Sequence, residues 1–229
     1  IHPEQKPGAV KAVFSYSLGG KQRTVRVTVK VKDVAYLVSE KRLDLGKYSD
    51  ESYYKDPARR KFIKECTQIR AMAFKSETED SITNTLSHPR DFHKITGPYW
   101  KKRIYLSYAR KKGGKKIKSK GRTSYHRGVD LKGDVGAPVY AMADGVVVLS
   151  HLLFYEGNMV VVDHGNKVFT YYMHMDSRSV SAGDRVRAGQ LIGTVGSTGT
   201  STGPHLHVAL SIRGVHVDPL SLLWLPVSR

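Results

Sequence analysis

From Tyr125 onward the sequence is a series of short β-prone runs separated by turns, and this pattern limits the possible folds more than any other feature. The runs cover residues 138–141, 145–150, 159–163, 168–173, 190–195 and 205–212. Glycine and aspartate interrupt them at intervals of about ten residues, as in antiparallel sheets. Helical periodicity is nearly absent here. The second half of the chain is therefore predicted to be an antiparallel all-β domain.

The first half has a different pattern, with one hairpin and one helix. Residues 10–18 and 22–32 predict a β-hairpin around Gly19 and Gly20, because valine alternates with polar residues along the second run. Asp56 and Pro57 suit the N-cap and the first turn of a helix that ends near Phe74. Residues 1–97 are expected to form a smaller α+β region, and residues 98–229 the β domain.

The predicted helix places its apolar side chains on one face. Phe62, Cys66, Ile69 and Ala73 recur at helical spacing. Cys66 is the single cysteine, so no intrachain disulfide can form, and we expect it in the core. Residues 76–95 are polar and are predicted to be loop with at most one short helix.

Positive charge is concentrated in the first half. Residues 1–120 hold 29 Lys and Arg against 12 Asp and Glu, whereas residues 121–229 hold 9 against 8. The formal net charge of +18 favours anionic polymers as partners, such as nucleic acid, anionic lipid or cell-wall polymers. Seven of the ten histidines lie in residues 121–229.

Residues 101–122 form the most basic segment, with 11 Lys and Arg and no acid. One interpretation is a short strand, 104–108, followed by a solvated loop. The other is a docking surface for an anionic polymer, formed by Lys111, Lys112, Lys115 and Lys116. Nucleic acid is disfavoured because the tyrosines stand at one end and are not interleaved with the charges.

The sequence GTSTGPHLHVAL, residues 199–210, contains two histidines one residue apart. In a strand, residues i and i+2 point to the same face, so His205 and His207 would lie side by side while Leu206 enters the core. Such a pair indicates either two metal ligands or one ligand beside a base.

Partners for this pair occur earlier in the same β-rich segment. His126 and Asp130 are four residues apart in YHRGVD, and His174 ends the run TYYMHM. Zinc accepts imidazole nitrogen and carboxylate oxygen, and a catalytic zinc keeps three protein ligands and one open position. His126, Asp130 and one histidine of the 205/207 pair would supply such a shell.

Residues 122–221 resemble the LytM-type domain of the M23 zinc metallopeptidases, the lysostaphin-like peptidases, and the likeness extends to about residues 98–225. The matching text is HRGVDLKGDVGAPVYAMADGVVV, GNMVVVDHGNKVFTYYMHM, VSAGDRVRAGQLIGTVGSTGTSTGPHLHVAL and VHVDPL. The resemblance implies a compact antiparallel β fold with a zinc site in the floor of a narrow groove. It implies one Zn²⁺ per chain, held by His126, Asp130 and His207, and catalytic roles for His174 and His205.

The resemblance also implies a function, namely hydrolysis of peptide cross-links or stem peptides of peptidoglycan, as endopeptidase or carboxypeptidase. The alternative is a non-catalytic LytM scaffold that activates another wall hydrolase. The protein is expected to act in the bacterial envelope, in the periplasm or at the cell surface, and its signal or anchor is not part of this sequence. Residues 1–97 have three possible roles. They could be an inhibitory cap in which His88 or His93 reaches the metal, they could be a binding module, or they could support folding and dimerisation.

Overall fold

The computed structural model describes residues 6–18, 21–32, 41–78, 85–91, 94–110 and 116–224. The chain divides into two compact units, residues 1–37 and residues 38–229. The first unit contains one antiparallel hairpin of β1 (Gly8–Leu18) and β2 (Lys21–Val31), which confirms the predicted hairpin. The residues of its turn, 19–20, lie outside the described part.

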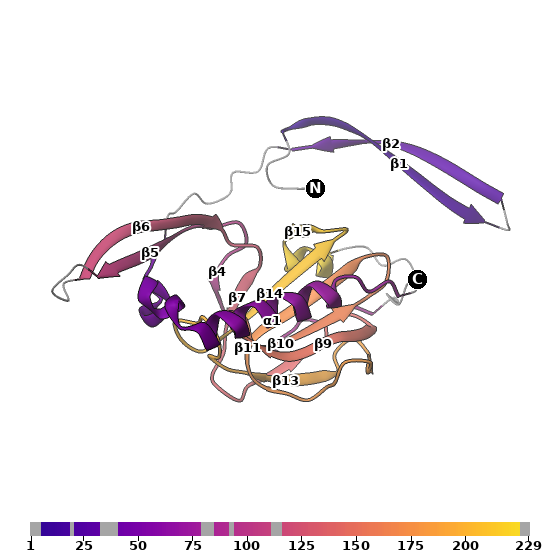
Figure 1. The fold of residues 1–229 in the computed structure, drawn as a ribbon. Coiled ribbons are helices and arrows are strands. Elements are labelled where there is room, and N and C mark those ends of the chain that lie inside the picture. The colour runs from indigo at the N-terminus through magenta and orange to yellow at the C-terminus, as the bar shows by residue number, and fades with distance from the viewer. Residues whose placement is uncertain are drawn as a thin grey trace. The chain divides into compact units, whose positions relative to one another are not determined.

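A ten-stranded sheet, antiparallel throughout, forms the body of the second unit (Figure 1). Its main path runs in the order β12-β9-β10-β11-β14-β7-β4, while β13 pairs with β11 and β8, and β15 pairs with β14. The strands are β4 (Ile95–Gly97), β7 (Val129–Lys132), β8 (Pro138–Tyr140), β9 (Gly145–Leu153), β10 (Gly157–Asp163), β11 (Val168–Arg178), β12 (Arg185–Val186), β13 (Leu191–Val195), β14 (His205–Ile212) and β15 (Val215–Val217). The predicted antiparallel all-β domain is therefore confirmed.

A smaller sheet and three 3₁₀ helices complete the described secondary structure. A three-stranded sheet has the order β3-β5-β6, in which β3 (Lys41–Leu43) runs parallel to β5 (Lys102–Arg110) and β6 (Lys116–Tyr125) runs antiparallel to it. Two short 3₁₀ helices, η1 (Gly46–Ser49) and η2 (Glu51–Lys55), follow β3, and η3 (Pro219–Trp224) follows β15.

Helix α1 (Pro57–Ala73) begins and ends close to where the sequence places it. The Asp56 side chain accepts a hydrogen bond from the Arg59 amide at 2.7 Å, which satisfies one of the free N–H groups of the first turn. Pro57 needs no such partner because it lacks an N–H. The N-cap and proline signals were therefore sufficient to locate this end.

Helix α1 lies across one face of the sheet (Figure 1). Its buried residues Cys66 and Ala73 share a core cluster with side chains of β9, β10, β11 and β14, among them Met159, Tyr171 and Ala209. Side chains alternate across a strand, so Ala209 points to the same face as His207 two residues before it. The helix therefore packs on the face of the sheet that carries the histidines.

Phe154, after β9, anchors the aromatic part of this core. Its ring lies within 6.3 Å, centroid to centroid, of the rings of Tyr48, Tyr53, Tyr54 and Phe62. Offset and edge-to-face contacts at such distances are favourable. Residues 48–74 are thus packed into the same unit as the β domain, and the expected boundary at residues 97 and 98 falls inside this unit.

Two expectations for the upstream segments have different outcomes. Residues 116–122, placed in a solvated loop by one of the two interpretations, belong to strand β6 (Lys116–Tyr125), in which all residues except Gly121 and Arg122 pair with β5. Among the described residues of 76–95 there is no helix. No helix of the described chain is long and apolar enough to cross a membrane.

Candidate metal centre and active site

Three predicted metal ligands meet at the paired strands β7 and β14. Asp130 and His207 are cross-strand neighbours in the antiparallel ladder, which brings their side chains together. His126 precedes β7 and is fixed by two backbone hydrogen bonds, from its own amide to Lys101 O at 2.9 Å and from the Trp100 amide to its carbonyl at 2.7 Å.

The donor atoms of these three residues converge on one point. His126 Nε2 lies 3.0 Å from His207 Nδ1 and 3.1 Å from Asp130 Oδ1, and His207 Nδ1 lies 2.8 Å from Asp130 Oδ1. Four bonds of about 2.0–2.1 Å in a tetrahedral zinc site place the ligand atoms roughly 3.3 Å apart. A shift of a few tenths of an ångström would therefore bring this set to zinc geometry, and the residues fit the ion.

Hydrogen bonds outside the cluster fix which atoms face it. His126 Nδ1 lies 2.9 Å from the carbonyl oxygen of Pro98, which can only accept, so Nδ1 carries the proton and Nε2 has the free lone pair. Asp130 Oδ2 accepts a charge-assisted hydrogen bond from Arg103 Nη2, which leaves Oδ1 for the cluster. Asp130 is thereby set up to bind a metal through one oxygen.

His174 and His205 stand beside this cluster. Their ring centroids are 4.9 Å apart, and the His174 ring lies 6.1 Å from that of His207. His174 Nδ1 donates to Thr198 O at 2.9 Å and His205 Nδ1 to Gly203 O at 2.7 Å. Both rings therefore keep Nε2 free, and His205 Nε2 lies 3.7 Å from Asp130 Oδ1.

Burial sets the protonation of the cluster. It lowers the pKa of His174 to about 3, and the neighbouring His205 and His207 add to the effect. Burial also lowers the pKa of His207. For Asp130, burial alone would raise the pKa, but hydrogen bonds with His126 and His207 outweigh it and hold the pKa well below its usual range. These directions favour neutral imidazoles at His174 and His207 and an ionised carboxylate at Asp130, and metal binding requires ligands in these forms.

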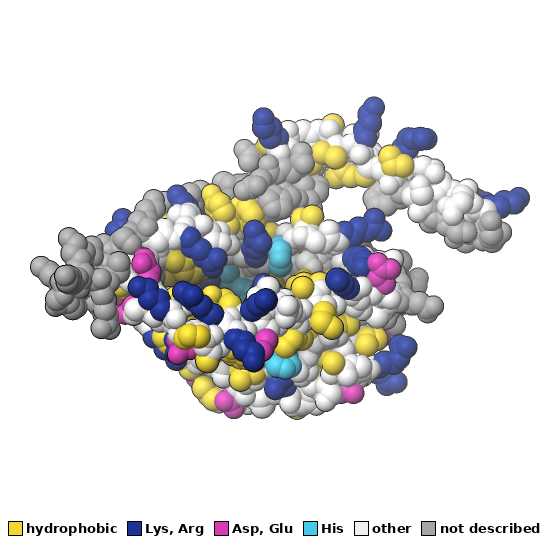
Figure 2. All heavy atoms as spheres, viewed as in Figure 1, with side chains coloured by type: hydrophobic (Ala, Val, Ile, Leu, Met, Phe, Trp, Pro, Cys, Tyr) yellow, Lys and Arg dark blue, Asp and Glu magenta, His cyan; other side chains and the backbone are white. Residues whose placement is uncertain are grey.

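The five residues line a groove of about 790 Å³. Figure 2 shows histidine side chains in a recess on this face, with Lys and Arg side chains around it. The upstream part of the chain supplies part of the wall, including Tyr48, Tyr54 and Arg70. The groove is therefore built by more than the β domain alone.

Other histidines are held away from this chemistry. His164 is fully buried, with Nδ1 2.6 Å from Asp144 O and Nε2 2.8 Å from Thr170 Oγ1. Both of its ring nitrogens are thus engaged in hydrogen bonds that hold the fold. His88 Nδ1 is engaged with the backbone of Arg90 and is not part of the cluster, while His93 lies outside the described residues.

Sequence reasoning missed the residues that support the ligands. Arg103 lies in the basic segment, where nothing distinguishes it from its neighbours, and its partner Asp130 is 27 residues away. Gly97 leaves room for this contact, since a Cβ there would overlap both Asp130 Oδ2 and Arg103 Nη2. Gly128, within the YHRGVD sequence, lies so close to His207 Nε2 that a Cβ would be 2.6 Å away.

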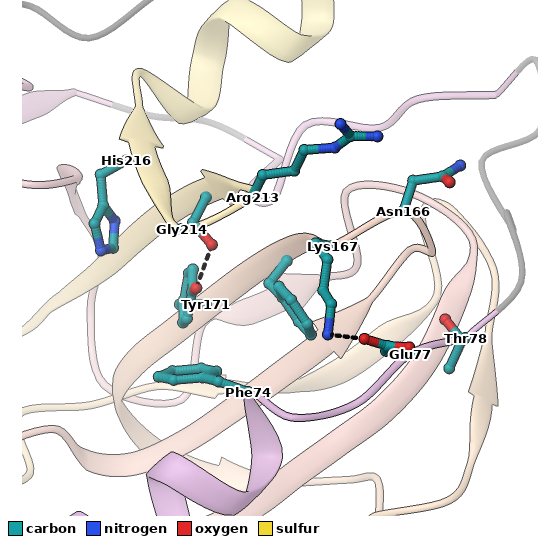
Figure 3. Close-up of a pocket in the computed structure, with 11 residues that line it drawn as sticks. Phe74, Glu77, Thr78, Asn166, Lys167, Tyr171, Arg213, Gly214 and His216 are labelled. Carbon is teal, nitrogen blue, oxygen red and sulfur yellow. Dashed lines mark hydrogen bonds and ion pairs between the residues drawn. The ribbon is translucent and has the colours of Figure 1, made fainter. Parts of the chain in front are cut away.

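A second pocket, of about 770 Å³, lies beside the end of α1 (Figure 3). Phe74 and Tyr171 supply aromatic walls, and Lys167 pairs with Glu77 at 2.7 Å. His216, on β15, has its ring 5.8 Å from that of Tyr171. Burial lowers the pKa of His216 to about 4, and Arg127 and His207 contribute further.

The antiparallel sheet thus carries a His₂Asp cluster on one face, and this cluster is a candidate metal centre. The family model of peptidase family M23 matches residues 124–219. The matched segment contains the three residues of the cluster as well as His174 and His205.

Relatives and a solved structure agree with this family. The chain is 37% identical over 134 residues to peptidoglycan DD-endopeptidase ShyC of Vibrio cholerae, covering 58% of this chain and 28% of the relative. It is 44% identical over 99 residues to ShyA of the same organism, covering 43% of this chain and 23% of the relative. The chain thus spans about a quarter of the length of these curated relatives.

The fold likeness extends further along the chain. A crystal structure of an M23 peptidase from Pseudomonas aeruginosa superposes with a TM-score of 0.58 at 24% identity, covering 95% of this chain and 74% of that one. This match supports the fold, including the elements before residue 124.

Proposed function

We propose that this protein is a zinc-dependent peptidoglycan hydrolase that cleaves peptide cross-links or stem peptides of the bacterial cell wall. The observation that carries the proposal is the convergence of His126, Asp130 and His207 in an open groove. Beside them His174 and His205 present free Nε2 atoms.

The proposed ligands are His126 through Nε2, Asp130 through Oδ1 and His207 through Nδ1. When bound, zinc would supply Lewis-acid polarisation of the scissile carbonyl and a water of lowered pKa. Asp130 offsets part of the ion's charge. The Arg103 contact keeps the Asp130 carboxylate turned toward the cluster.

The two remaining histidines would handle protons. A neutral imidazole can accept a proton from the attacking water at Nε2 and, once protonated, can donate to the oxyanion or to the leaving amine. The Nδ1 hydrogen bonds to Thr198 and Gly203 fix the tautomers that this chemistry needs. Either His174 or His205 can serve as the base in this arrangement.

The substrate class follows from the relatives. ShyC and ShyA are named peptidoglycan DD-endopeptidases, and the Mpg protein of Neisseria meningitidis, 45% identical over 97 residues, is a DD-carboxypeptidase/endopeptidase. Peptidoglycan peptides are therefore the proposed substrates, and the bacterial envelope is the proposed location. A DD-carboxypeptidase activity is compatible with the same site.

Docking to anionic wall polymers remains part of the proposal. Lys111, Lys112 and Lys115 lie outside the described residues, and Lys116 is described only through its place in strand β6. Neutralising all four should weaken binding to whole cell walls at low salt, because exposed charges are screened over about 8–10 Å at physiological ionic strength. Residues 98–229 are proposed as the peptidase domain proper.

The decisive experiment is digestion of purified muropeptides of known cross-link, with products identified by mass spectrometry. The zinc-loaded protein should release defined fragments, a chelator should abolish the release, and His205→Ala should reduce it while keeping the metal. A metal-loaded, correctly folded protein that leaves every muropeptide intact would refute the hydrolase and favour the scaffold that activates another wall enzyme.

A further inference from the structure

We propose that Arg70 of α1 is a positioning residue for His174 and acts through Glu156. The upstream helix would then support the site and not cap it. The expected effect on kcat rests on the proposed function, but the contacts that support the inference do not depend on the substrate.

The first contact joins the helix to the groove. The guanidinium of Arg70, in the last turn of α1, pairs with the carboxylate of Glu156. The Glu156 side chain is only 10% exposed, whereas that of Arg70 is 41% exposed, so the carboxylate is the buried partner. Cys66 and Ala73, buried on the same helix, hold it against the sheet. Arg70 is thus attached to a fixed support.

The second contact joins Glu156 to the proposed catalytic histidine. The backbone N–H of His174 donates to the Glu156 carbonyl at 2.8 Å. His174 has a φ of 62°, in the left-handed region that non-glycine residues seldom adopt and that costs on the order of 1 kcal/mol or more. Such a conformation persists only where the surroundings hold it in place.

The surroundings of His174 are two short segments that meet around it. Thr198 O accepts from His174 Nδ1, and the Asn158 amide donates to Thr198 Oγ1 at 2.9 Å. Gly157, with a φ of 67°, allows this approach, since a Cβ there would overlap Thr198. The turn that contains Glu156 and Gly157 therefore fixes both the backbone and the ring of His174.

Arg70 determines whether this turn stays in place. A buried carboxylate without its cation moves toward water, because desolvation of an unpaired charge is costly. The carboxylate and the carbonyl that holds His174 belong to the same residue, so movement of one displaces the other. Loss of Arg70 should therefore loosen His174 without touching the metal ligands.

The test compares Arg70→Met with Lys64→Met. Both remove one positive charge from the same helix at little cost in helix propensity, but Lys64 is exposed, and no contact of its side chain is described. Arg70→Met should lower kcat for muropeptide cleavage about tenfold, a part of the roughly 10²–10⁴ that acid–base catalysis by His174 would contribute. It should leave KM and zinc content near the parent values. The Lys64 variant should match the parent.

A second readout follows the contact itself. Amide hydrogen exchange measured by NMR should become about tenfold faster at His174 in Arg70→Met, while core amides of β10 keep parental protection. Glu156→Gln should have a smaller effect, because the neutral amide tolerates the loss of Arg70. The double variant Arg70→Met/Glu156→Gln should therefore be less impaired than the product of the single effects.

Three results would overturn the inference. One is a parental kcat and a parental His174 exchange rate in Arg70→Met. Another is a rise in kcat, which would mean that the helix restricts access to the groove. The third is uniformly faster amide exchange throughout the β domain, which would indicate a purely structural role for Arg70. If Arg70→Met does not fold, the same measurements are made on Arg70→Lys and Glu156→Gln. If the unmodified protein does not hydrolyse muropeptides, the proposed function is refuted. The hydrogen-exchange measurement would still show whether Arg70 holds His174 in place.

Discussion

The half-buried His216 of the second pocket should make the metal-free protein sensitive to acid, and His216→Phe isolates this effect. An unfolded histidine has a pKa of about 6.5, whereas His216 in the folded protein has a pKa of about 4. Between these values the unfolded chain takes up a proton that the folded ring resists. Stability is therefore lost as the pH falls from about 6.5 to about 4.

The size of the effect follows from the shift. A difference of about 2.5 pKa units corresponds to about 3 kcal/mol, since one unit is 1.36 kcal/mol. The ring is partly exposed, so solvent screening reduces this to roughly 2 kcal/mol. Phenylalanine cannot titrate and can keep the contact with Tyr171 (Figure 3). His216 Nδ1 has no hydrogen-bond partner among the described residues, so its removal should cost little at neutral pH.

The assay is urea unfolding of both proteins at pH 7.5 and pH 4, with a chelator present so that the metal ligands do not contribute through zinc. The parent should lose about 2 kcal/mol more free energy of unfolding than His216→Phe between the two pH values. Equal losses in the two proteins would refute the assignment of the shifted pKa to this residue.

Other predictions concern the site and the core that supports it. His207→Ala should remove most of the zinc by elemental analysis, whereas His174→Ala and His205→Ala should keep it and lose roughly 10²–10⁴ in rate; full zinc in the first variant, or parental cleavage in either of the others, would contradict the assigned roles. Arg103→Met should weaken zinc binding about 10–100-fold in chelator competition, although it also removes a positive charge near the ion. Phe154→Ala should lower the free energy of unfolding by about 3–5 kcal/mol in urea titrations, because it empties the centre of the aromatic cluster; a loss under 1 kcal/mol would show that the cluster collapses without cost.

The strands and the cluster were predictable because each depends on local sequence. Alternation and turn residues located the β domain, and the strand rule put His205 and His207 on one face, with Leu206 completely buried between them. The order and spacing of the M23-like text then linked these two histidines to His126 and Asp130. Such signals can be read from the sequence without knowledge of tertiary contacts.

What the sequence did not reveal depends on pairs that are distant along the chain. Arg70 and Glu156 are separated by 86 residues, and no local pattern distinguishes Arg70 from other charges of α1. The interpretation of residues 116–122 as a solvated loop was wrong because it relied on their charge, while a strand at the edge of a sheet needs only backbone partners. The left-handed backbone of His174 likewise arises from the turns packed around it.

The packing of α1 across the sheet limits how the protein can be cut or transplanted. Removal of residues 1–97 would uncover Phe154, Tyr171 and their neighbours, and a newly exposed apolar face of this kind promotes aggregation. Loss of activity in such a truncated protein would therefore indicate aggregation, and it would not be evidence that residues 1–97 regulate the site. Removal of residues 1–37 takes away one compact unit and leaves the helix in place. A fusion protein or crystallisation fragment designed around the groove with the His₂Asp cluster should accordingly start before β3, well upstream of the matched family segment.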